Sequence, residues 1–182
     1  APIRPGVNVR SATLDPIREA ARICADHDAV LEVNAHCRQE ELCAVGCGET
    51  LLRDAERLAA SVDAAVDAGA TVSVKVRAEV DGADLPVTAR AVADAGADVI
   101  HVDAMDSEPV IADVAAAVPN AFVLANNGVR DRRTAWEYLA YGADGVSVGR
   151  PSDDPAVLER VARAVTDWER RGRDAGHDGE VP

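Results

Sequence analysis

Residues 67–77 read "DAGATVSVKVR", a glycine turn that leads into a run rich in valine. A glycine after a helical stretch ends the helix, because glycine readily adopts the left-handed backbone of a C-terminal cap. The short β-branched run that follows predicts a buried strand. Nearly the same phrase returns as "DAGADV" from Asp94 and as "YGADGV" from Tyr141. The repeat therefore predicts a chain in which helices and strands alternate.

Short β-branched runs of this kind occur along most of the chain. They begin at Gly6, Ala29, Thr71, Asp98, Ala121 and Gly145. Strands separated by helices in this way predict a parallel sheet of the α/β class. Two folds fit such units: an open doubly wound sheet, and most of a TIM-type (β/α)₈ barrel, which typically needs ~250 residues.

Polar residues at the ends of the expected strands favour the barrel. They are Asn8, Asn34, Lys75, Asp103, Asn126 and Gly149. Barrel enzymes keep their chemistry at the carboxyl ends of the strands. No expected strand is followed by the G-x-G-x-x-G turn of a dinucleotide-binding sheet. We therefore expect a TIM (β/α)₈-type barrel of which about six β/α units are visible.

The charge of the chain bears on its partners. Its 182 residues include 32 acidic and 19 basic residues, for a net charge of −13. Such a charge argues against broad nucleic-acid binding unless a local basic patch exists. An excess of aspartate with a single lysine is also typical of proteins from salt-loving microbes, so the acidity by itself says little about partners. No apolar run could span a bilayer and the first residues lack a signal-peptide pattern, so we expect a cytoplasmic protein without membrane contact.

The most informative segment is "VLEVNAHCRQEELCAVGCGETLLRD", residues 30–54, which combines a strand, a polar loop with a cysteine, and a glycine turn into a helix. It resembles the tRNA-dihydrouridine synthases, whose strand ends in Asn-x-Gly-Cys-Pro before a glycine-rich turn and Leu-Leu. Further matches follow in the family's order: "VKVR" (74–77), "AGAD" (95–98), "NNGVRD" (126–131) and "GADGVSVGR" (142–150). The resemblance covers most of the chain and extends, less specifically, to dihydroorotate and dihydropyrimidine dehydrogenases, which share the flavin barrel.

The resemblance implies an FMN-dependent oxidoreductase. In the family, reduced flavin delivers a hydride to C6 of a uracil ring and a loop cysteine gives a proton to C5. Cys37 would be that proton donor, and Asn34 a hydrogen-bond partner of the substrate or the flavin. Lys75 would lie near the pyrimidine edge of the flavin and stabilise its anionic reduced form.

The same resemblance places the FMN-binding residues at several strand ends. Gly128, Gly149 and Arg150 would bind the phosphate through backbone amides and a guanidinium group. The other expected cofactor-binding positions, besides Lys75, are Asn8, Asp103, Asn126 and Asn127. NADPH or NADH would be the reductant, and the substrate would be a pyrimidine, either free or within tRNA.

The chain departs from the family pattern at several positions of this site. His36 and Arg38 replace the Gly and Pro that flank the cysteine. Asp103 stands where the family usually has a flavin-contacting histidine, and an acid there would oppose the effect of Lys75 unless the two side chains pair. His101 lies two residues earlier on the same strand and so points to the same side as Asp103.

The resemblance also bears on domain organisation. Residues 1–168 are expected to form the FMN-binding barrel domain, N-terminally incomplete, and residues 169–182 a charged, disordered tail that lacks periodic apolar residues. The family's first two strands and its helical RNA-binding domain have no counterpart in this sequence, so we expect either a fragment or a shortened relative. The open barrel edges would need cover from a partner or a homo-oligomer.

Simpler interpretations of the same residues stay open. Lys75 could reach from a strand end to water, and Cys37 could be an inert loop thiol. Residues 126–127 could serve only to shape a turn, and residues 149–150 could be a plain strand-to-helix connection. Cys37, Cys43 and Cys47 with His36 could be metal ligands, but their spacings miss the paired C-x₂-C pattern, so no metal is expected.

Two other functions compete with the flavoenzyme. One is a barrel that has lost flavin chemistry and serves as an interaction subunit, which the change to Asp103 and the missing strands motivate. The other is a phosphate-binding barrel for a small phosphorylated metabolite. Residues 142–150 would serve that function equally well, but Lys75 and Cys37 would then be coincidences.

Overall fold

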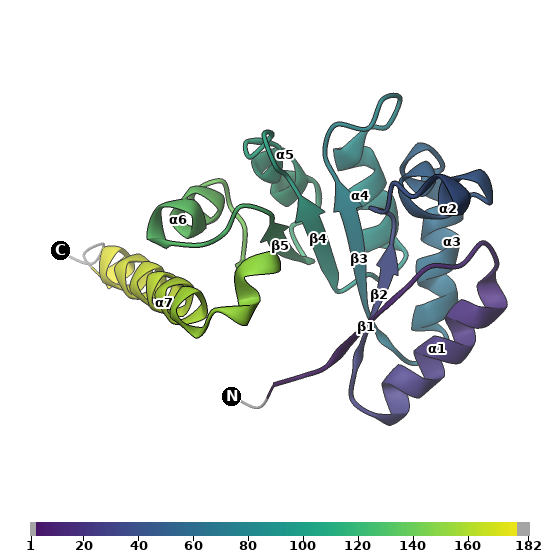
Figure 1. The fold of residues 1–182 in the computed structure, drawn as a ribbon, viewed down its shortest axis with the longest axis horizontal. Helices are drawn as coiled ribbons and strands as arrows, with labels where there is room; N and C mark the ends of the chain where they lie inside the picture. Colours follow the sequence, from purple (N-terminus) through teal and green to yellow (C-terminus); the bar gives the residue numbers. More distant parts are fainter. Residues whose placement is uncertain (1–2, 178–182) are drawn as a thin grey trace.

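The computed structural model describes residues 3–177 of the chain, and within them strands alternate with helices (Figure 1). The strands are β1 (Gly6–Val9), β2 (Val30–Asn34), β3 (Thr71–Arg77), β4 (Val99–Asp103), β5 (Phe122–Asn126) and β6 (Gly145–Ser147). The α-helices are α1 (Leu14–Asp26), α2 (Glu40–Ala44), α3 (Ala55–Val66), α4 (Leu85–Asp94), α5 (Val110–Ala117), α6 (Arg132–Ala140) and α7 (Pro155–His177). Two 3₁₀ helices, η1 (Gly48–Arg53) and η2 (Arg150–Asp153), precede α3 and α7. Every expected strand is present.

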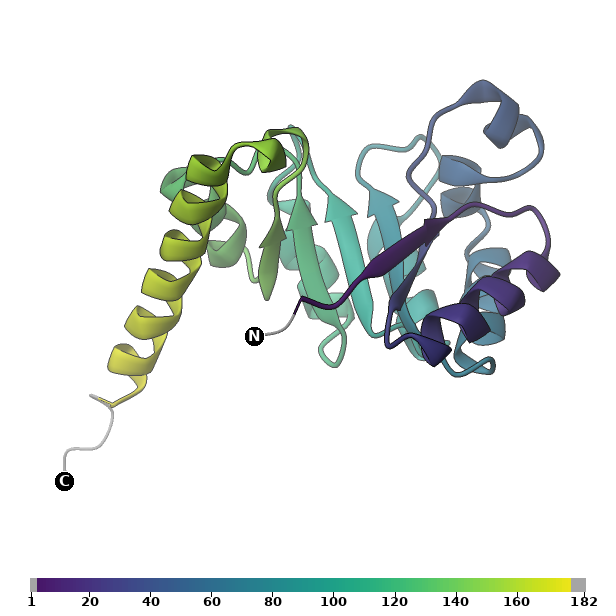
Figure 2. The same cartoon turned by 60° about the horizontal axis from the view of Figure 1, so that its bottom comes forward.

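The strands form one parallel sheet in the order in which they occur in the chain, β1-β2-β3-β4-β5-β6. A doubly wound sheet reverses its strand order at a switch point, and the described strands do not. Because crossovers between parallel strands are right-handed, an unreversed order places the connecting helices on the same side of the sheet, as Figure 2 shows. This arrangement confirms the predicted fold class, since the strands form an arc of a TIM-type barrel.

The two faces of the sheet differ in polarity. Side chains alternate between the faces along each strand. The face beneath the helices consists of buried apolar residues: Leu31, Val33, Val72, Val74, Val76, Ile100, Val102 and Val123. The opposite face, which we call the concave face, carries polar residues, and the pairing register aligns Asn34, Lys75 and His101 in one row across β2, β3 and β4. The apolar face therefore holds the fold together, and the polar face is available for chemistry.

Each copy of the repeated glycine turn has the backbone conformation that the sequence predicts. Gly69, Gly96 and Gly142 have φ angles of +90°, +97° and +95°, a region that side chains other than glycine rarely adopt. A Cβ atom on Gly96 would also lie 3.2 Å from Cγ2 of Val66. These glycines let the chain leave a helix and enter the next strand within a few residues.

Helix α7 is held against α6 by a cluster of Trp136, Ala164, Trp168 and Arg171, which we call the tryptophan clasp. The rings of Trp136 and Trp168 meet edge to face with 5.5 Å between centroids. Nε1 of Trp136 donates a hydrogen bond to the carbonyl oxygen of Ala164 at 2.8 Å, and the Arg171 guanidinium lies 4.6 Å over the same ring. Helix α7 therefore continues past Trp168, where the domain boundary is expected, to His177. Residues 178–182 of the expected tail lie outside the described residues.

The two edge strands of the sheet, β1 and β6, are its shortest strands. Among the described strands, β1 and β6 each pair with a single neighbour. β6 is three residues long and pairs with β5 through residues 145–147. Cover of these edges by a partner or a second copy stays a prediction. In the part of the chain that the structure describes, no helix is both long enough and apolar enough to cross a membrane.

Candidate active site at the carboxyl ends of the strands

A cavity of about 450 Å³ lies beside the carboxyl ends of β5 and β6. Its lining residues are His36, Met105, Asn126, Asn127, Gly128, Val129, Arg130, Gly149, Arg150 and Pro151. Residues 126–128 and 149–150 among them are positions that the sequence predicts to bind a cofactor. They come from the turns after β5 and β6, which meet because these two strands are paired. The size of the cavity suits a small ligand.

A buried tyrosine supports the turn after β5. Asn127 and Gly128 have φ angles of +88° and +69°, which asparagine and glycine tolerate better than other residues. The hydroxyl of Tyr138 lies 3.2 Å from the carbonyl oxygen of Asn126 and 3.0 Å from that of Asn127, and donates between them. Burial raises the pKa of Tyr138, so its hydroxyl stays a donor. Tyr138 is not among the residues predicted for the site, because in the sequence it is only one more residue on the buried side of a helix.

Asn34 organises the loop that follows β2. Its Oδ1 accepts hydrogen bonds from the backbone N–H groups of His36 at 3.0 Å and Cys37 at 2.9 Å. Its Nδ2 donates to Oδ1 of Asn8 at 3.0 Å. The predicted residues Asn8, Asn34 and Cys37 are thus linked by hydrogen bonds to the side chain of Asn34.

The loop holds Cys37 close to a glycine turn. Gly48 has a φ of +63°, and a Cβ atom there would lie 2.2 Å from the carbonyl oxygen of Cys37. The same oxygen accepts a hydrogen bond from the N–H of Glu49 at 2.9 Å. The half-buried thiol of Cys37 donates to Oε1 of Gln39 at 3.4 Å. Cys37 is not one of the described residues that line the cavity, whereas its neighbour His36 is.

The other cysteines do not gather into a metal site. Cys24, Cys43 and Cys47 are free thiols, like Cys37. Burial raises the pKa of Cys24 and Cys47, which disfavours the thiolate that a metal would bind. Among the residues that the structure describes, no group of three or more His, Cys, Asp or Glu side chains is placed to hold a metal ion.

Asp103 forms an ion pair with His36 rather than with Lys75. Its Oδ2 lies 2.5 Å from Nε2 of His36, and its Oδ1 accepts from Nδ2 of Asn127 at 2.9 Å. Burial acts to raise the pKa of Asp103, but the hydrogen bonds from His36 and Asn127 outweigh it and lower the pKa well below its usual range. Asp103 and His36, two residues that differ from the family pattern, therefore contact each other.

Lys75 is left without a partner. It is half-buried on the concave face, in register with Asn34 on one side and His101 on the other. The carboxylates nearest in the sheet bind histidines, because Asp103 pairs with His36 and Glu32 with His101. Within residues 3–177, Lys75 makes no ion pair and no side-chain hydrogen bond. The ammonium group is thus available to a ligand.

Glu32 is the centre of a second polar cluster, which the sequence analysis does not assign to the site. Its Oε1 accepts from Nδ2 of Asn8 at 2.7 Å, and its Oε2 accepts from Oγ of Ser73 at 3.0 Å and Nδ1 of His101 at 2.7 Å. Burial acts to raise the pKa of Glu32, but the hydrogen bonds from His101, Asn8 and Ser73 outweigh it and lower the pKa to about 2. The signal in the sequence is a charged residue inside the apolar run at residues 29–34.

Comparison with known protein families places this site in context. Residues 7–174 match the dihydrouridine synthase family. The chain belongs to that family. Apart from Gly6 at the start of β1, the six strands and the lining of the cavity lie within the matched residues, so the resemblance seen in the sequence is confirmed.

The dihydrouridine synthase relatives are longer than this chain. The tRNA-dihydrouridine synthase B of Xanthomonas axonopodis pv. citri (strain 306) is 28% identical over 180 residues, which cover 90% of the chain and 54% of the relative. An uncharacterised protein of Methanocaldococcus jannaschii is 27% identical over 154 residues, which cover 79% of the chain and 58% of that protein. The chain thus spans little more than half the length of these relatives.

A solved structure with the same fold is the DHODH of Eimeria tenella in complex with ferulenol. It matches 92% of this chain and 59% of its own with a TM-score of 0.65, at 16% sequence identity. At this level of identity the similarity concerns the fold alone. It agrees with the arc of a TIM-type barrel described above.

Proposed function

We propose that the protein is an FMN-dependent oxidoreductase that reduces the C5–C6 bond of a uracil ring in tRNA. The observation that carries this proposal is the meeting of residues 126–128 and 149–150 in one cavity, at the same end of the sheet as an unpaired lysine. Membership of the dihydrouridine synthase family supports the same reaction, as does similarity to a tRNA-dihydrouridine synthase of Xanthomonas.

The residues of the cavity suit FMN. A Cβ atom on Gly128 would meet no atom within 4 Å, and on Gly149 the nearest atom would be Oδ1 of Asn126 at 4.0 Å. The turns therefore leave space for a phosphate against the backbone. The exposed guanidinium of Arg150 has no ion-pair partner among the described residues and can bind such a phosphate as a planar fork. Lys75 would stand beside the pyrimidine half of the flavin, where positive charge stabilises the reduced anion.

The hydrogen bonds of Asp103 weaken the main electrostatic objection to this arrangement, because they hold its carboxylate away from a pairing with Lys75. An unpaired carboxylate at the end of β4 would oppose the effect of Lys75 on an anionic flavin. His36 and Asn127 bind both carboxylate oxygens instead. The positive charge of Lys75 is then the uncompensated charge of the row to which it belongs.

In the proposed reaction, bound reduced FMN would supply the hydride for C6 of the uracil ring. We infer that Cys37 gives the proton to C5, as the family resemblance implies. Asn34 fixes the backbone of this residue by accepting from its N–H group. The thiol donates a hydrogen bond to the exposed side chain of Gln39, and a substrate could replace that partner.

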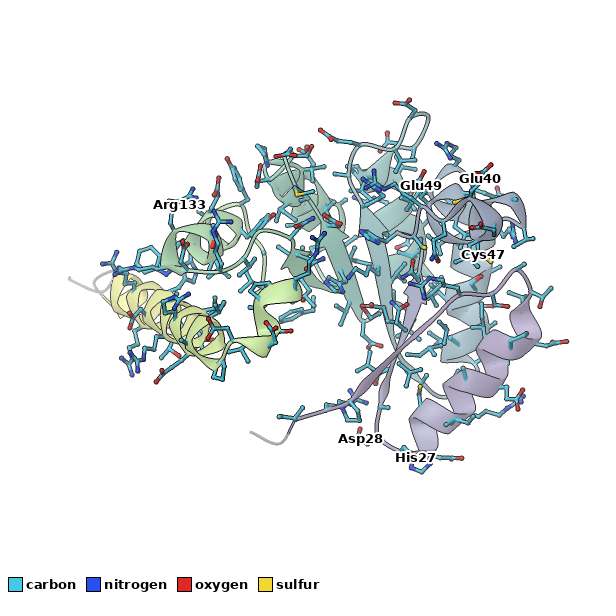
Figure 3. All side chains as sticks on the ribbon, in the orientation of Figure 1. His27, Asp28, Glu40, Cys47, Glu49 and Arg133 are labelled. Carbon is cyan, nitrogen blue, oxygen red and sulfur yellow. The ribbon has the colours of Figure 1, made fainter. Side chains whose placement is uncertain are left out.

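Arginines around the cavity favour an RNA substrate over a free pyrimidine. Arg130 and Arg150 line the cavity, and Arg130 and Arg133 line a smaller hollow of about 210 Å³ beside it. Arg133 lies on α6, facing away from the sheet (Figure 3). In the smaller hollow Arg133 pairs with Glu137, so the positive charge is that of Arg130 and Arg150. No Asp or Glu is among the described residues that line the larger cavity, and a phosphate backbone would need such cations. NADPH or NADH would reduce the flavin, and a cytoplasmic location would suit a tRNA substrate.

The proposal is tested with purified full-length protein. We expect bound FMN with its visible absorption, and reoxidation of the reduced flavin when unmodified tRNA is added without oxygen. Lys75→Met should weaken FMN binding about tenfold, because one favourable charge interaction is lost, whereas Arg22→Met on the exposed side of α1 should not. Protein that binds no FMN would instead favour an interaction subunit or a barrel for a phosphorylated metabolite. Bound FMN that neither tRNA nor uridine reoxidises would also contradict the proposal.

A further inference from the structure

One ring nitrogen of His101 has no partner. The residue is 7% exposed, and Nδ1 lies 2.7 Å from Oε2 of Glu32. Its other ring nitrogen, Nε2, is buried and makes no hydrogen bond. Within residues 3–177 it is the one buried side-chain nitrogen or oxygen atom without such a bond. Buried polar atoms in proteins are nearly always paired, and leaving one unpaired costs stability. Nε2 of His101 is thus a buried polar atom to which the described residues supply no partner.

The surroundings of Glu32 fix which nitrogen of His101 stays unpaired. The lowered pKa of Glu32 means that its carboxylate is ionised and can only accept hydrogen bonds. Nδ1 of His101 must therefore carry the proton of that contact. Asn8 and Ser73 hold the same carboxylate at 2.7 and 3.0 Å, so it cannot turn away. In the neutral ring, Nε2 then presents a lone pair that accepts a hydrogen bond.

The neighbour of His101 on the next strand is Lys75. Adjacent strands lie about 4.8 Å apart, so the row places a donor without a partner beside an acceptor without a partner. On the other side, His101 is in register with the apolar Leu124. A ligand that matches this arrangement carries a carbonyl group, which accepts from Lys75, next to an N–H group, which donates to His101.

We propose that Lys75 and His101 together bind the imide edge of a pyrimidine ring. Lys75 donates to a ring carbonyl, and Nε2 of His101 accepts from the neighbouring ring N–H. Both the pyrimidine half of a flavin and the uracil ring of the substrate have this edge. The proposal rests on the proposed function and adds His101 as a binding residue, with Glu32 as the residue that orients it.

Two substitutions at His101 separate binding from packing. His101→Asn keeps an amide nitrogen close to the place of Nδ1, where it can still donate to Glu32, but it removes Nε2. His101→Gln restores a polar amide close to the place of Nε2. His27→Asn is the matched control, because His27 is exposed at the far end of α1 (Figure 3). Thermal melting of each variant shows whether it is folded.

The first measurement is nitrogen-15 NMR of histidine-labelled full-length protein at about pH 8. We expect His101 to carry its proton on Nδ1, with an unprotonated Nε2. A shift of the Nε2 resonance on addition of FMN identifies the flavin as the ligand. A shift that appears only when uridine is added to the FMN complex identifies the substrate. If FMN binds but neither addition moves the resonance, or if Nε2 is protonated throughout, the proposal is wrong.

The second measurement is affinity for the ligand that moves the resonance. His101→Asn should weaken its binding about tenfold, and His101→Gln should recover part of the loss. Unchanged affinity in His101→Asn, or an equal loss in both variants, would overturn the proposal. A protein that binds no FMN at all refutes the proposed function, and this inference with it. FMN binding without any effect of His101 refutes this inference alone.

Discussion

The structure contains two histidine–carboxylate pairs that differ in what they connect. The mouth pair, His36 and Asp103, ties a loop to the end of β4, and its side chains are 30% and 14% exposed. The inner pair, His101 and Glu32, ties β4 to β2 across the concave face, and its side chains are 9% and 18% exposed. The mouth pair joins a residue that lines the cavity to the end of β4, whereas in the inner pair Nε2 of His101 has no partner among the described residues. In our proposals the mouth pair keeps Asp103 away from Lys75, and the inner pair orients a binding residue.

The largest expected effect is on the rate of the reaction, and it concerns Cys37 in the loop that also carries His36 of the mouth pair. Cys37→Ala should slow reoxidation of the reduced flavin by tRNA about 10² to 10⁴-fold, because a general acid typically contributes that much. FMN affinity should not change, since Cys37 does not line the cavity among the described residues. Stopped-flow absorbance of the flavin measures the rate. Cys24→Ala, at a buried thiol in α1, is the control, and equal turnover in the Cys37 variant would show that another group donates the proton.

The next largest effect concerns the inner pair. Glu32→Ala should lower the free energy of unfolding by about 3 kcal/mol, because the buried donors Ser73 and His101 and the exposed Asn8 lose the carboxylate that accepts from them. Urea titration followed by circular dichroism measures the change. Asp15→Ala removes a carboxylate whose side chain is 96% exposed and should have almost no effect. A similar loss in both variants would mean that the inner pair contributes no more to the free energy of unfolding than an exposed carboxylate does.

Acid should act on both pairs in the same direction. The folded pKa of Glu32 is about 2, below its ordinary value of 4.5, and that of Asp103 is also lowered. A carboxylate with a lowered folded pKa stabilises the fold above its unfolded pKa, and that contribution is lost as the pH falls through the folded value. Unfolding free energy should thus decrease between about pH 4.5 and pH 2, by roughly 3 kcal/mol for Glu32. Glu32→Gln should flatten this decrease when urea titrations are repeated across that range, and an unchanged slope would contradict the assignment.

The smallest effect is expected at the mouth pair. Asp103→Ala should destabilise the fold by about 1 to 2 kcal/mol, because His36 and Asn127 lose a shared acceptor but are close to water. A double-mutant cycle with His36→Ala measures the coupling between the two side chains. Additive losses would show that the contact between His36 and Asp103 does not contribute to stability.

Most of the fold could be predicted from the sequence, because each strand is a short apolar run after a glycine turn. The meeting of residues 126–128 with 149–150 also followed, since parallel strands end at the same edge of the sheet. The partner of Asp103 did not follow. Alternation along a strand shows which face a side chain occupies, but His36 lies in a loop whose path depends on hydrogen bonds to Asn34 and on the close approach of Gly48. Such contacts between distant segments have no periodic signal.

The tryptophan clasp has a mechanical consequence for the last strand. β6 is paired with β5 through only three residues, so it separates from the sheet more easily than the five-residue β5. Helix α7 follows β6 in the chain and is bound to α6 through Trp136, Trp168 and Ala164. A pulling force applied to α7 therefore acts first on the tryptophan clasp between α6 and α7. It reaches the pairing of β6 with β5 only after the clasp has separated.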